Sequence, residues 1–305
     1  MALLKKLKVL AVKAFVGGEW NVAFRKCDTD DKYQIVDMPE GTCIADPFMY
    51  EADGEHYLFV ELFEKKKNKA CIAYYKFIDS KPVYQGKIID QPYHMSYPCV
   101  FEHKGAHYMI PETSANLSID LYQATEFPHK WQKVKTLFSG VRYIDTTVLK
   151  QADRYYAVSY QKATQGWALD SFILDMEAMT MVKVKSKQYD TNICRPAGHF
   201  IRKDQLLRPA QNCARKYGEN IILYCVDRFD DINYEEHQTT HIDVSSIPMD
   251  KKPNRIHTYN RDSMYEVVDV YFEQMDLLHG VNTLWRAYLR KYFPKSLRYR
   301  LRNCT

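Results

Sequence analysis

Four copies of one strand–turn–strand pattern, spaced about fifty residues apart, constrain this chain more than any other feature of its sequence. When the copies are aligned on Tyr57, Tyr108, Tyr156 and Leu207, the steps between these anchors are 51, 48 and 51 residues. Each copy contains two apolar runs of strand length joined by a tight turn, of which Asp53-Gly54 is the clearest β-hairpin signal. A strand-rich repeat with this period predicts the blades of a β-propeller.

Each repeat continues beyond its hairpin with a third strand-like run, and the first copies show a fourth. Four antiparallel strands per repeat are typical of a propeller blade. Further strand-like runs outside the repeats are expected to form a fifth blade, and they lie at 20–25, 33–36, 238–246, 257–260 and 264–271. A blade built from both ends of the chain closes the ring and removes exposed sheet edges. The sequence therefore predicts an all-β, five-bladed β-propeller over residues 19–272.

The hairpins also predict where polar residues gather. Within each copy, the residue that opens the first run and the residue that ends the second lie equally far from the turn. Antiparallel pairing therefore places the two side by side. If the first run is the innermost strand of its blade, these residues ring one mouth of the central channel. The charged residues predicted at this mouth are Asp46, Glu61, Glu112, Asp145 and Arg195.

The two ends of the chain are basic. Residues 1–13 carry four lysines and no acid, and residues 281–305 carry seven lysines or arginines and no acid. Apolar residues recur at helical spacing in both segments. We therefore expect short amphipathic helices over residues 1–18 and 273–305. Aromatic residues lie opposite arginines in the second helix, which favours binding to an anionic membrane surface.

The charge and the cysteine pattern indicate which classes of protein fit this chain. The net charge is +5, so with basic ends the body of the chain is acidic, which does not fit a nucleic-acid-binding surface. The eight cysteines are scattered and include no C-x-x-C, as expected for reduced cysteines in a cytoplasmic protein. No metal is expected, because the candidate histidines show no metal-ligand spacing; these are His199, His237, His241 and His257.

Several strings resemble the propellers of carbohydrate-active enzymes. The blade openings Ala45-Asp46-Pro47-Phe48 and Asp145-Thr146-Thr147-Val148 resemble five-bladed glycoside hydrolases that act on arabinans, xylans, fructans and mannosides. Strings at 94–98, 110–116, 127–131 and 208–213 more specifically resemble the N-terminal propeller domain of plant glucosamine inositolphosphorylceramide transferases and of related bacterial surface-glycan proteins. The resemblance spans roughly residues 20–270 and implies sugar chemistry at the mouth.

Asp46, Glu112 and Asp145 are the candidate catalytic residues. Sugar transfer needs carboxyl groups on opposite sides of the anomeric carbon. In the resembling hydrolases an Asp of the first blade is base or nucleophile, a role that Asp46 matches by position. Glu112 lies on the second repeat, earlier than the acid of those enzymes, so the individual roles stay open. The structural alternative is that these carboxylates only bind solvent or a cation.

Six further residues are predicted to bind substrate. Arg195 and Arg208 carry the guanidinium geometry that fits phosphate, although ion pairs with the mouth carboxylates explain them equally well. His94 and Tyr97 are expected to position sugar hydroxyls. Glu61 is expected to orient a neighbouring group, and Gln211 ends the fourth hairpin at the same mouth.

These patterns favour a glycosyltransferase-like enzyme at the cytoplasmic face of the inner membrane. It would move a sugar from an activated donor to a surface polysaccharide or glycolipid acceptor. No cofactor is expected, since the donor, a nucleotide sugar, is a substrate. A glycoside hydrolase with the same fold and a non-catalytic glycan-binding module are the two alternatives.

Overall fold

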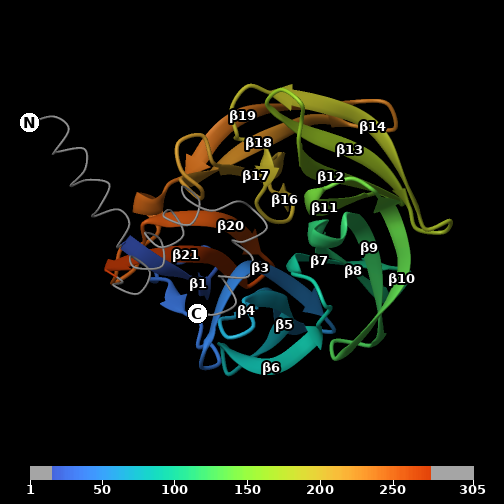
Figure 1. The fold of residues 1–305 in the computed structure, drawn as a ribbon. Coiled ribbons are helices and arrows are strands. Elements are labelled where there is room, and N and C mark those ends of the chain that lie inside the picture. Colours follow the sequence, from blue (N-terminus) through green and yellow to red (C-terminus); the bar gives the residue numbers. More distant parts are fainter. Residues whose placement is uncertain (1–15, 276–305) are drawn as a thin grey trace, which may run out of the picture. The chain divides into compact units, whose positions relative to one another are not determined.

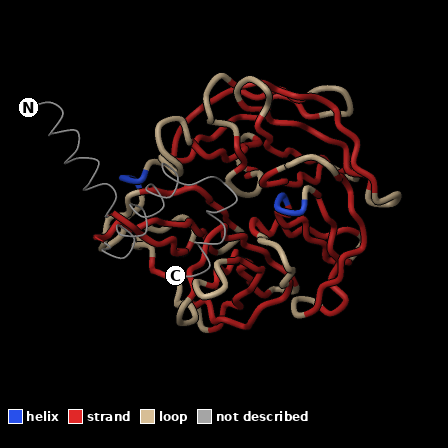
Figure 2. Tube along the Cα trace, in the orientation of Figure 1, coloured by secondary structure: helices blue, strands red, loops and turns tan. Residues whose placement is uncertain are grey.

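The computed structural model describes residues 16–275, and most of both predicted terminal helices lies outside these residues. Residues Trp20–Val270 form one compact unit. Nearly all of its regular structure is strand, with two single turns of 3-10 helix, η1 (Ser114–Asn116) and η2 (Val244–Ser246) (Figure 2). Among the described residues, no helix has the length and apolar character needed to cross a bilayer.

Four blades follow one another along the chain, each an antiparallel sheet. The first holds β3 (Thr42–Ala52), β4 (Glu55–Glu64), β5 (Lys69–Ile78) and β6 (Lys81–Ile89). The second holds β7 (Ser96–His103), β8 (Ala106–Thr113), β9 (Ser118–Glu126) and β10 (Lys130–Ser139). The third holds β11 (Ile144–Gln151), β12 (Arg154–Lys162), β13 (Trp167–Asp175) and β14 (Thr180–Tyr189). The fourth holds β15 (Arg195–Pro196), β16 (Ile201–Arg202), β17 (Leu206–Asn212), β18 (Asn220–Phe229) and β19 (Tyr234–Ile242).

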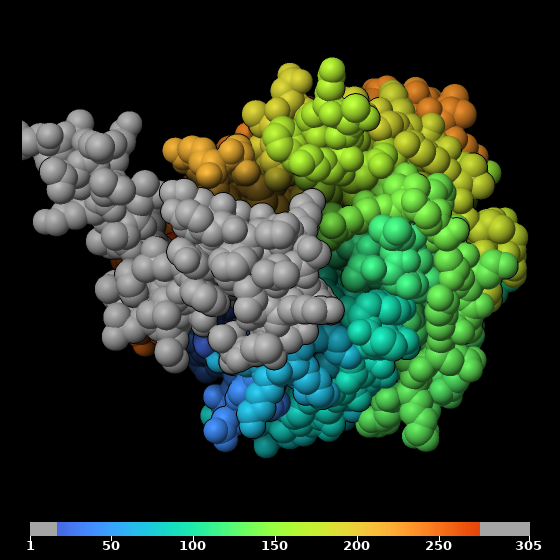
Figure 3. Space-filling model, in the orientation of Figure 1, coloured from blue at the N-terminus to red at the C-terminus, as the bar shows by residue number. Residues whose placement is uncertain are grey.

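The fifth blade closes the ring with strands from both ends of the described chain, as the sequence predicts. Its order is β20 (Arg255–Arg261), β21 (Tyr265–Met275), β1 (Val16–Lys26) and β2 (Gln34–Ile35). Figure 1 shows the five sheets arranged around a common centre, with β3, β7, β11 and β20 innermost. In the space-filling view the blades follow the chain order around the unit (Figure 3).

Two sequence-based assignments need correction. The run at 238–246 was expected in the fifth blade, but β19 is the outer strand of the fourth, because it pairs with β18 in the register Cys225↔His237. The predicted terminal helices were expected to reach residue 18 and to begin at residue 273. Residues 16–18 instead belong to β1 and residues 273–275 to β21.

Apolar residues that alternate along the strands pack between neighbouring blades. One core cluster joins the first three blades and includes Phe59, Met109 and Phe172, each fully buried. Aromatic rings meet edge to face across the blades, as for Phe48 and Tyr97, whose ring centroids lie 4.6 Å apart. Cys71 and Cys99 are buried in these cores and form no disulfide.

The hairpin registers place the predicted mouth residues side by side to within one residue. The observed pairs at the ends of the four hairpins are Ala45↔Glu61, Ser96↔Glu112, Ile144↔Tyr160 and Arg195↔Gln211. In the first three blades the register shifts directly after this pair. The residue at the shift is Asp46, Tyr97 or Asp145, and each takes a left-handed backbone conformation with φ of 47°, 47° and 54°. Since a bulge re-aims the side chain it carries, the same distortion turns one polar residue per blade toward the centre.

Gly198 tests how closely the fourth and fifth blades approach. Its φ is 127°, and a Cβ at this position would lie 2.1 Å from the Tyr259 carbonyl oxygen. We expect Gly198→Ala to lower the free energy of unfolding by about 2–4 kcal/mol, because backbone strain and a clash with a backbone atom add together. Gly105→Ala is the matched control: its φ is 75°, but no atom lies within 4 Å of the added Cβ. It should cost only about 1 kcal/mol. Denaturant unfolding of both variants checks this, and equal losses would contradict the close approach.

Candidate functional site

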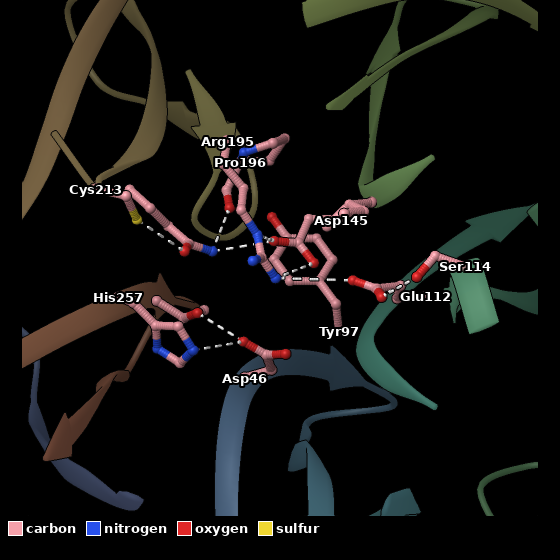
Figure 4. A network of polar contacts seen from close by, with 12 residues as sticks. Asp46, Tyr97, Glu112, Ser114, Asp145, Arg195, Pro196, Cys213 and His257 are labelled. Atoms are coloured by element: carbon pink, nitrogen blue, oxygen red, sulfur yellow. Dashed lines mark hydrogen bonds and ion pairs between the residues drawn. The ribbon is translucent and has the colours of Figure 1, made fainter. Parts of the chain in front are cut away.

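Four inner strands, together with β8 of the second blade, bring ionisable side chains of all five blades to one place at the centre of the propeller. Figure 4 shows Asp46, Glu112, Asp145, Arg195 and His257 pointing toward one another from strands far apart in the sequence. The structure therefore brings together the three candidate catalytic residues and the predicted arginine. The contacts divide into two groups, one around Arg195 and one around His257.

Arg195 joins two of the acids. Its Nε donates to Asp145 Oδ2 at 2.5 Å and its Nη2 donates to Asp145 Oδ1 at 3.3 Å. The same Nη2 lies 3.8 Å from Glu112 Oε2. Gln211 Nε2 donates a further bond of 3.0 Å to Asp145 Oδ2. Burial raises the pKa of Asp145 to about 7; the Arg195 guanidinium opposes this shift, and the neighbouring Glu112 carboxyl adds to it.

Glu112 is the more accessible acid of this group. Its side chain is 12% exposed, whereas that of Asp145 is completely buried. Ser114 lies at the start of η1, and its hydroxyl donates to Glu112 Oε1 at 2.6 Å, which orients the carboxylate. Within the described part of the chain, Glu112 Oε2 accepts no hydrogen bond. This oxygen is itself buried, so it is an unsatisfied acceptor inside the protein.

The fifth blade supplies the second group, in which His257 lies between two buried carboxylates. His257 Nε2 lies 3.5 Å from Asp46 Oδ1, and His257 Nδ1 contacts Asp269 Oδ2. Asp46 Oδ1 also accepts a hydrogen bond of 2.9 Å from the Thr258 hydroxyl. Asp269 accepts the backbone N–H groups of His257 and Thr258 at 2.9 and 2.8 Å. The His257 ring stacks on Trp20 with centroids 4.1 Å apart, so packing fixes its plane.

Both titratable groups of this pair have a raised pKa. Burial raises the pKa of Asp46 to about 7, against the influence of His257 and with a contribution from Glu61 and Asp145. Burial alone would lower the pKa of His257, but the Asp269 and Asp46 carboxylates outweigh it and the net shift is upward. Burial thus makes both Asp46 and Asp145 harder to ionise than an ordinary aspartate.

Glu61 and His94 form a more exposed polar pair. His94 Nε2 lies 3.2 Å from Glu61 Oε1, and the His94 side chain is 42% exposed. The hydrogen bond to Glu61 raises the pKa of His94 against the opposing effect of burial. Glu61 pairs with Ala45 across the hairpin, one residue from Asp46, and its charge contributes to the raised pKa of Asp46.

Tyr97, Arg208 and Gln211 were predicted to bind substrate, but all three side chains are completely buried and bonded to protein, Gln211 to Asp145 and to the Pro196 carbonyl. The Tyr97 hydroxyl lies 2.8 Å from Thr147 Oγ1 and accepts the Gly198 N–H at 2.7 Å, which links three blades. Arg208 Nε and Nη2 donate to the two carboxylate oxygens of Glu236 at 2.7 and 2.8 Å. Tyr97 and Arg208 therefore hold strands and blades together in place of the predicted substrate contacts.

Sequence reasoning missed several members of the site. Asp269 was one detectable case, because it is a lone carboxylate inside the apolar run 267–270. His257 was weighed only for metal-ligand spacing, and its two Asp partners come from other strands. Tyr217, whose ring centroid lies 5.6 Å from the Arg195 guanidinium carbon, and Ser114 lie in connections between strands and carry no signal of their own.

Known structures share the fold. Zg3597, a family 117 glycoside hydrolase from Zobellia galactanivorans, superposes with a TM-score of 0.52 at 10% identity, covering 84% of this chain and 91% of that one. The α-L-arabinofuranosidase PaAbf62A from Podospora anserina gives a TM-score of 0.55 at 12% identity, covering 72% and 77%. At such identities the similarity establishes the fold alone.

Sequence relatives are more specific. The family model described as "Glucosamine inositolphosphorylceramide transferase 1, N-terminal" matches residues 18–260. Proteins named glucosamine inositolphosphorylceramide transferase 1 from Oryza sativa subsp. japonica and Arabidopsis thaliana are each 24% identical over 204 residues. These matches cover 63% of this chain but only 27% and 26% of the relatives. The chain thus spans about a quarter of the length of these relatives.

The raised pKa of Asp46 makes stability depend on pH. Because its pKa rises from 3.8 in the unfolded chain to about 7 in the fold, the folded state binds more protons between these values. The free energy of unfolding should therefore fall as pH rises from about 4 to 7, and Asp46→Asn should reduce this fall. Asp250→Asn, at a side chain that is 89% exposed, is the control and should leave the slope unchanged. Urea titrations across this range give the slopes; identical slopes in wild type and Asp46→Asn would contradict the assignment.

The structural role of Tyr97 is separately testable. Tyr97→Phe leaves the buried Gly198 N–H without its acceptor, so it should lower the free energy of unfolding by about 1–3 kcal/mol. Tyr75→Phe is the matched control, because the Tyr75 hydroxyl is also buried but has no hydrogen-bond partner in the described structure. This control should lose nothing. Thermal or denaturant unfolding distinguishes the two, and an unchanged Tyr97→Phe would remove the proposed link between blades.

The fold and the sequence matches lead to the same assignment. Five blades close around a polar centre, as the sequence resemblance implies, and the family match covers most of the compact unit 20–270. The chain therefore belongs to the family described as glucosamine inositolphosphorylceramide transferase 1, N-terminal.

Proposed function

We propose that this propeller binds a glycan at its centre and transfers a sugar from an activated donor to a polysaccharide or glycolipid acceptor. The observation that carries the proposal is the convergence of Asp46, Glu112 and Asp145 beside Arg195. Burial raises the pKa of Asp46 to about 7, so this carboxyl group can give and take a proton under neutral conditions. The names of the sequence relatives support transfer as the reaction class and a glycolipid as the acceptor class.

The geometry favours Glu112 as the group that accepts the proton of the acceptor hydroxyl. Its Oε2 is buried and accepts no hydrogen bond among the described residues, so a hydroxyl that reached it would satisfy it. Ser114 and Arg195 hold the carboxylate in place. Asp145 is held by Arg195 and Gln211, so its role is to position Arg195 against the developing charge of the leaving group. Asp46 is the second carboxyl at the sugar, and His257 sets its protonation.

The charge balance of the centre indicates which part of a substrate it receives. Five carboxyl groups lie here, from Asp46, Glu61, Glu112, Asp145 and Asp269. Arg195 contacts Asp145 and Glu112, His257 contacts Asp46 and Asp269, and His94 contacts Glu61. Such a surface suits sugar hydroxyls and disfavours phosphates, because like charges repel at short range in a partly buried site. We therefore expect the sugar to lie against the acids and any donor phosphate to reach only Arg195.

A non-catalytic glycan-binding module is the second candidate. Two observations favour it. The chain spans about a quarter of the length of its named relatives. The Asp145 carboxylate is already bound by Arg195 and Gln211. Hydrolysis is a weaker alternative, because the likeness to glycoside hydrolases establishes the fold alone.

We also propose a nucleotide sugar as donor, a cytoplasmic site of action and attachment to an anionic membrane. The resemblance supports a nucleotide sugar as the donor. The scattered cysteines, with no C-x-x-C, support a cytoplasmic site of action. Attachment of residues 281–305 to an anionic membrane rests on their seven basic residues, which lie outside the described part of the chain. Flotation with anionic liposomes, with and without these residues, checks the attachment, and equal flotation would contradict it.

Glu112→Gln is the sharpest test of catalysis. Wild-type protein incubated with a panel of nucleotide sugars and glycan or glycolipid acceptors should show stabilisation by a donor in thermal shift and sugar transfer by mass spectrometry. Glu112→Gln should keep ligand affinity and lose about 100-fold or more in turnover, since a general base typically contributes that much. Glu55→Gln, at the opposite end of the same kind of hairpin, should behave as wild type.

The competing functions give different results in the same assay. Glycan binding without turnover, unchanged in Glu112→Gln, would contradict catalysis and support the binding module. Release of a free sugar from aryl glycosides without any acceptor would support hydrolysis instead. No stabilisation by any donor or glycan would contradict both the transferase and the binding module.

A further inference from the structure

A second cluster of ligand-type side chains lies on the outer half of the fourth blade, away from the residues of the central site. Cys225 and Asp227 belong to β18 and His237 to β19. One Sγ, one carboxylate oxygen and one imidazole nitrogen of these residues lie within 4.8 Å of one another. His237 Nδ1 lies 2.8 Å from Asp227 Oδ2.

The strand register explains why three residues separated by up to twelve positions meet here. Cys225 and His237 are direct partners in the antiparallel ladder, so their side chains lie on the same face of the sheet. The ladder slips between Val226 and Arg228, which leaves Asp227 as an extra, unpaired residue. A bulge of this kind re-aims a side chain, and here the Asp227 carboxylate meets the imidazole that lies across from Cys225.

We propose that Cys225, Asp227 and His237 bind a zinc ion. Thiolate sulfur, imidazole nitrogen and carboxylate oxygen are the three ligand types that zinc takes in proteins, and three protein ligands leave a fourth position for water or a further ligand. A thiolate in the set disfavours Mg²⁺ and Ca²⁺, which take oxygen ligands. Binding deprotonates the Cys225 thiol and releases that proton to solvent, so the bound site of Zn²⁺, thiolate and carboxylate is neutral.

The burial pattern fits a metal better than a reactive thiol. Cys225 is only 7% exposed, whereas the side chains of His237 and Asp227 are 58% and 45% exposed. A nucleophilic cysteine has to face its substrate, but here the sulfur lies at the floor and the imidazole and carboxylate lie above it. An ion arriving from solvent meets the two exposed ligands first and the thiol last.

Two other clusters fit a metal less well. In Glu64, Cys71 and Asp90, both carboxylates are already paired with lysines, namely Lys87 and Lys69. In Asp46, His257 and Asp269, all three residues are buried, and the two carboxylates already accept hydrogen bonds from the Thr258 hydroxyl and from backbone N–H groups. The sequence predicts no metal from the spacing of histidines along the chain. Such spacing does not show residues that meet across two strands.

Metal titration of the full-length protein tests the proposal. After treatment with a chelator and its removal, the protein is titrated with Co²⁺ and then with Zn²⁺ as competitor. We expect one Co²⁺ per chain, with a thiolate-to-cobalt charge-transfer absorption that Zn²⁺ abolishes. His237→Asn, at an exposed position that should not disturb folding, should weaken binding about 100-fold or more, since even partners outside the ligand set typically contribute 10–100-fold.

Two controls make the outcome decisive. His241→Asn lies on the same strand, outside the cluster, and should bind Co²⁺ as wild type does. Cys225→Ser should lose the charge-transfer band even if residual binding persists. Absence of the band in wild type would overturn the proposal, as would an equal affinity in wild type and His237→Asn. Rapid alkylation of Cys225 that Zn²⁺ does not slow would also overturn it in favour of a reactive thiol.

Discussion

The ion pair between Arg195 and Asp145 is the interaction on which the centre of this propeller depends. Asp145 is completely buried, and a buried carboxylate without a partner costs several kcal/mol. The Arg195 guanidinium lowers the pKa of Asp145 against the effect of burial. Its Nη2 also lies 3.8 Å from Glu112 Oε2. One guanidinium from the fourth blade thereby holds acids of the third and second blades together. In the same way, His257 joins Asp46 of the first blade to Asp269 of the fifth.

A repeated backbone distortion turns the acids inward, where they need these partners. Asp46, Tyr97 and Asp145 adopt left-handed conformations at the same point of three inner strands, which costs roughly 1–2 kcal/mol at each non-glycine residue. The contacts that follow offset this strain: the backbone N–H of Asp46 donates to Asp269 at 3.2 Å, and the Tyr97 hydroxyl binds Gly198. The same geometry that points acids inward also ties neighbouring blades, so the site and the fold share their stabilising contacts.

Much of this arrangement could be predicted from the sequence, because it follows from local periodicity. The hairpin pattern sets the blade order and places Glu61 and Glu112 at the mouth within one residue. The burial of Arg208 could not be predicted in this way. It depends on Glu236, which lies on another strand, and no spacing in the sequence connects the two residues. The strand at 238–246 was misplaced for a related reason, since outer strands of different blades have the same alternating pattern. His257 and Cys225 gain their chemistry only from cross-strand partners.

A crystal structure with a bound glycan or a hydrolysis-resistant donor tests the central claim most directly. The account predicts a sugar ring at the centre of the propeller, with one hydroxyl within hydrogen-bond distance of Glu112 Oε2 and the ring in contact with Asp46. A ligand bound elsewhere on the propeller, with the Arg195, Asp145 and Glu112 group untouched, would contradict it.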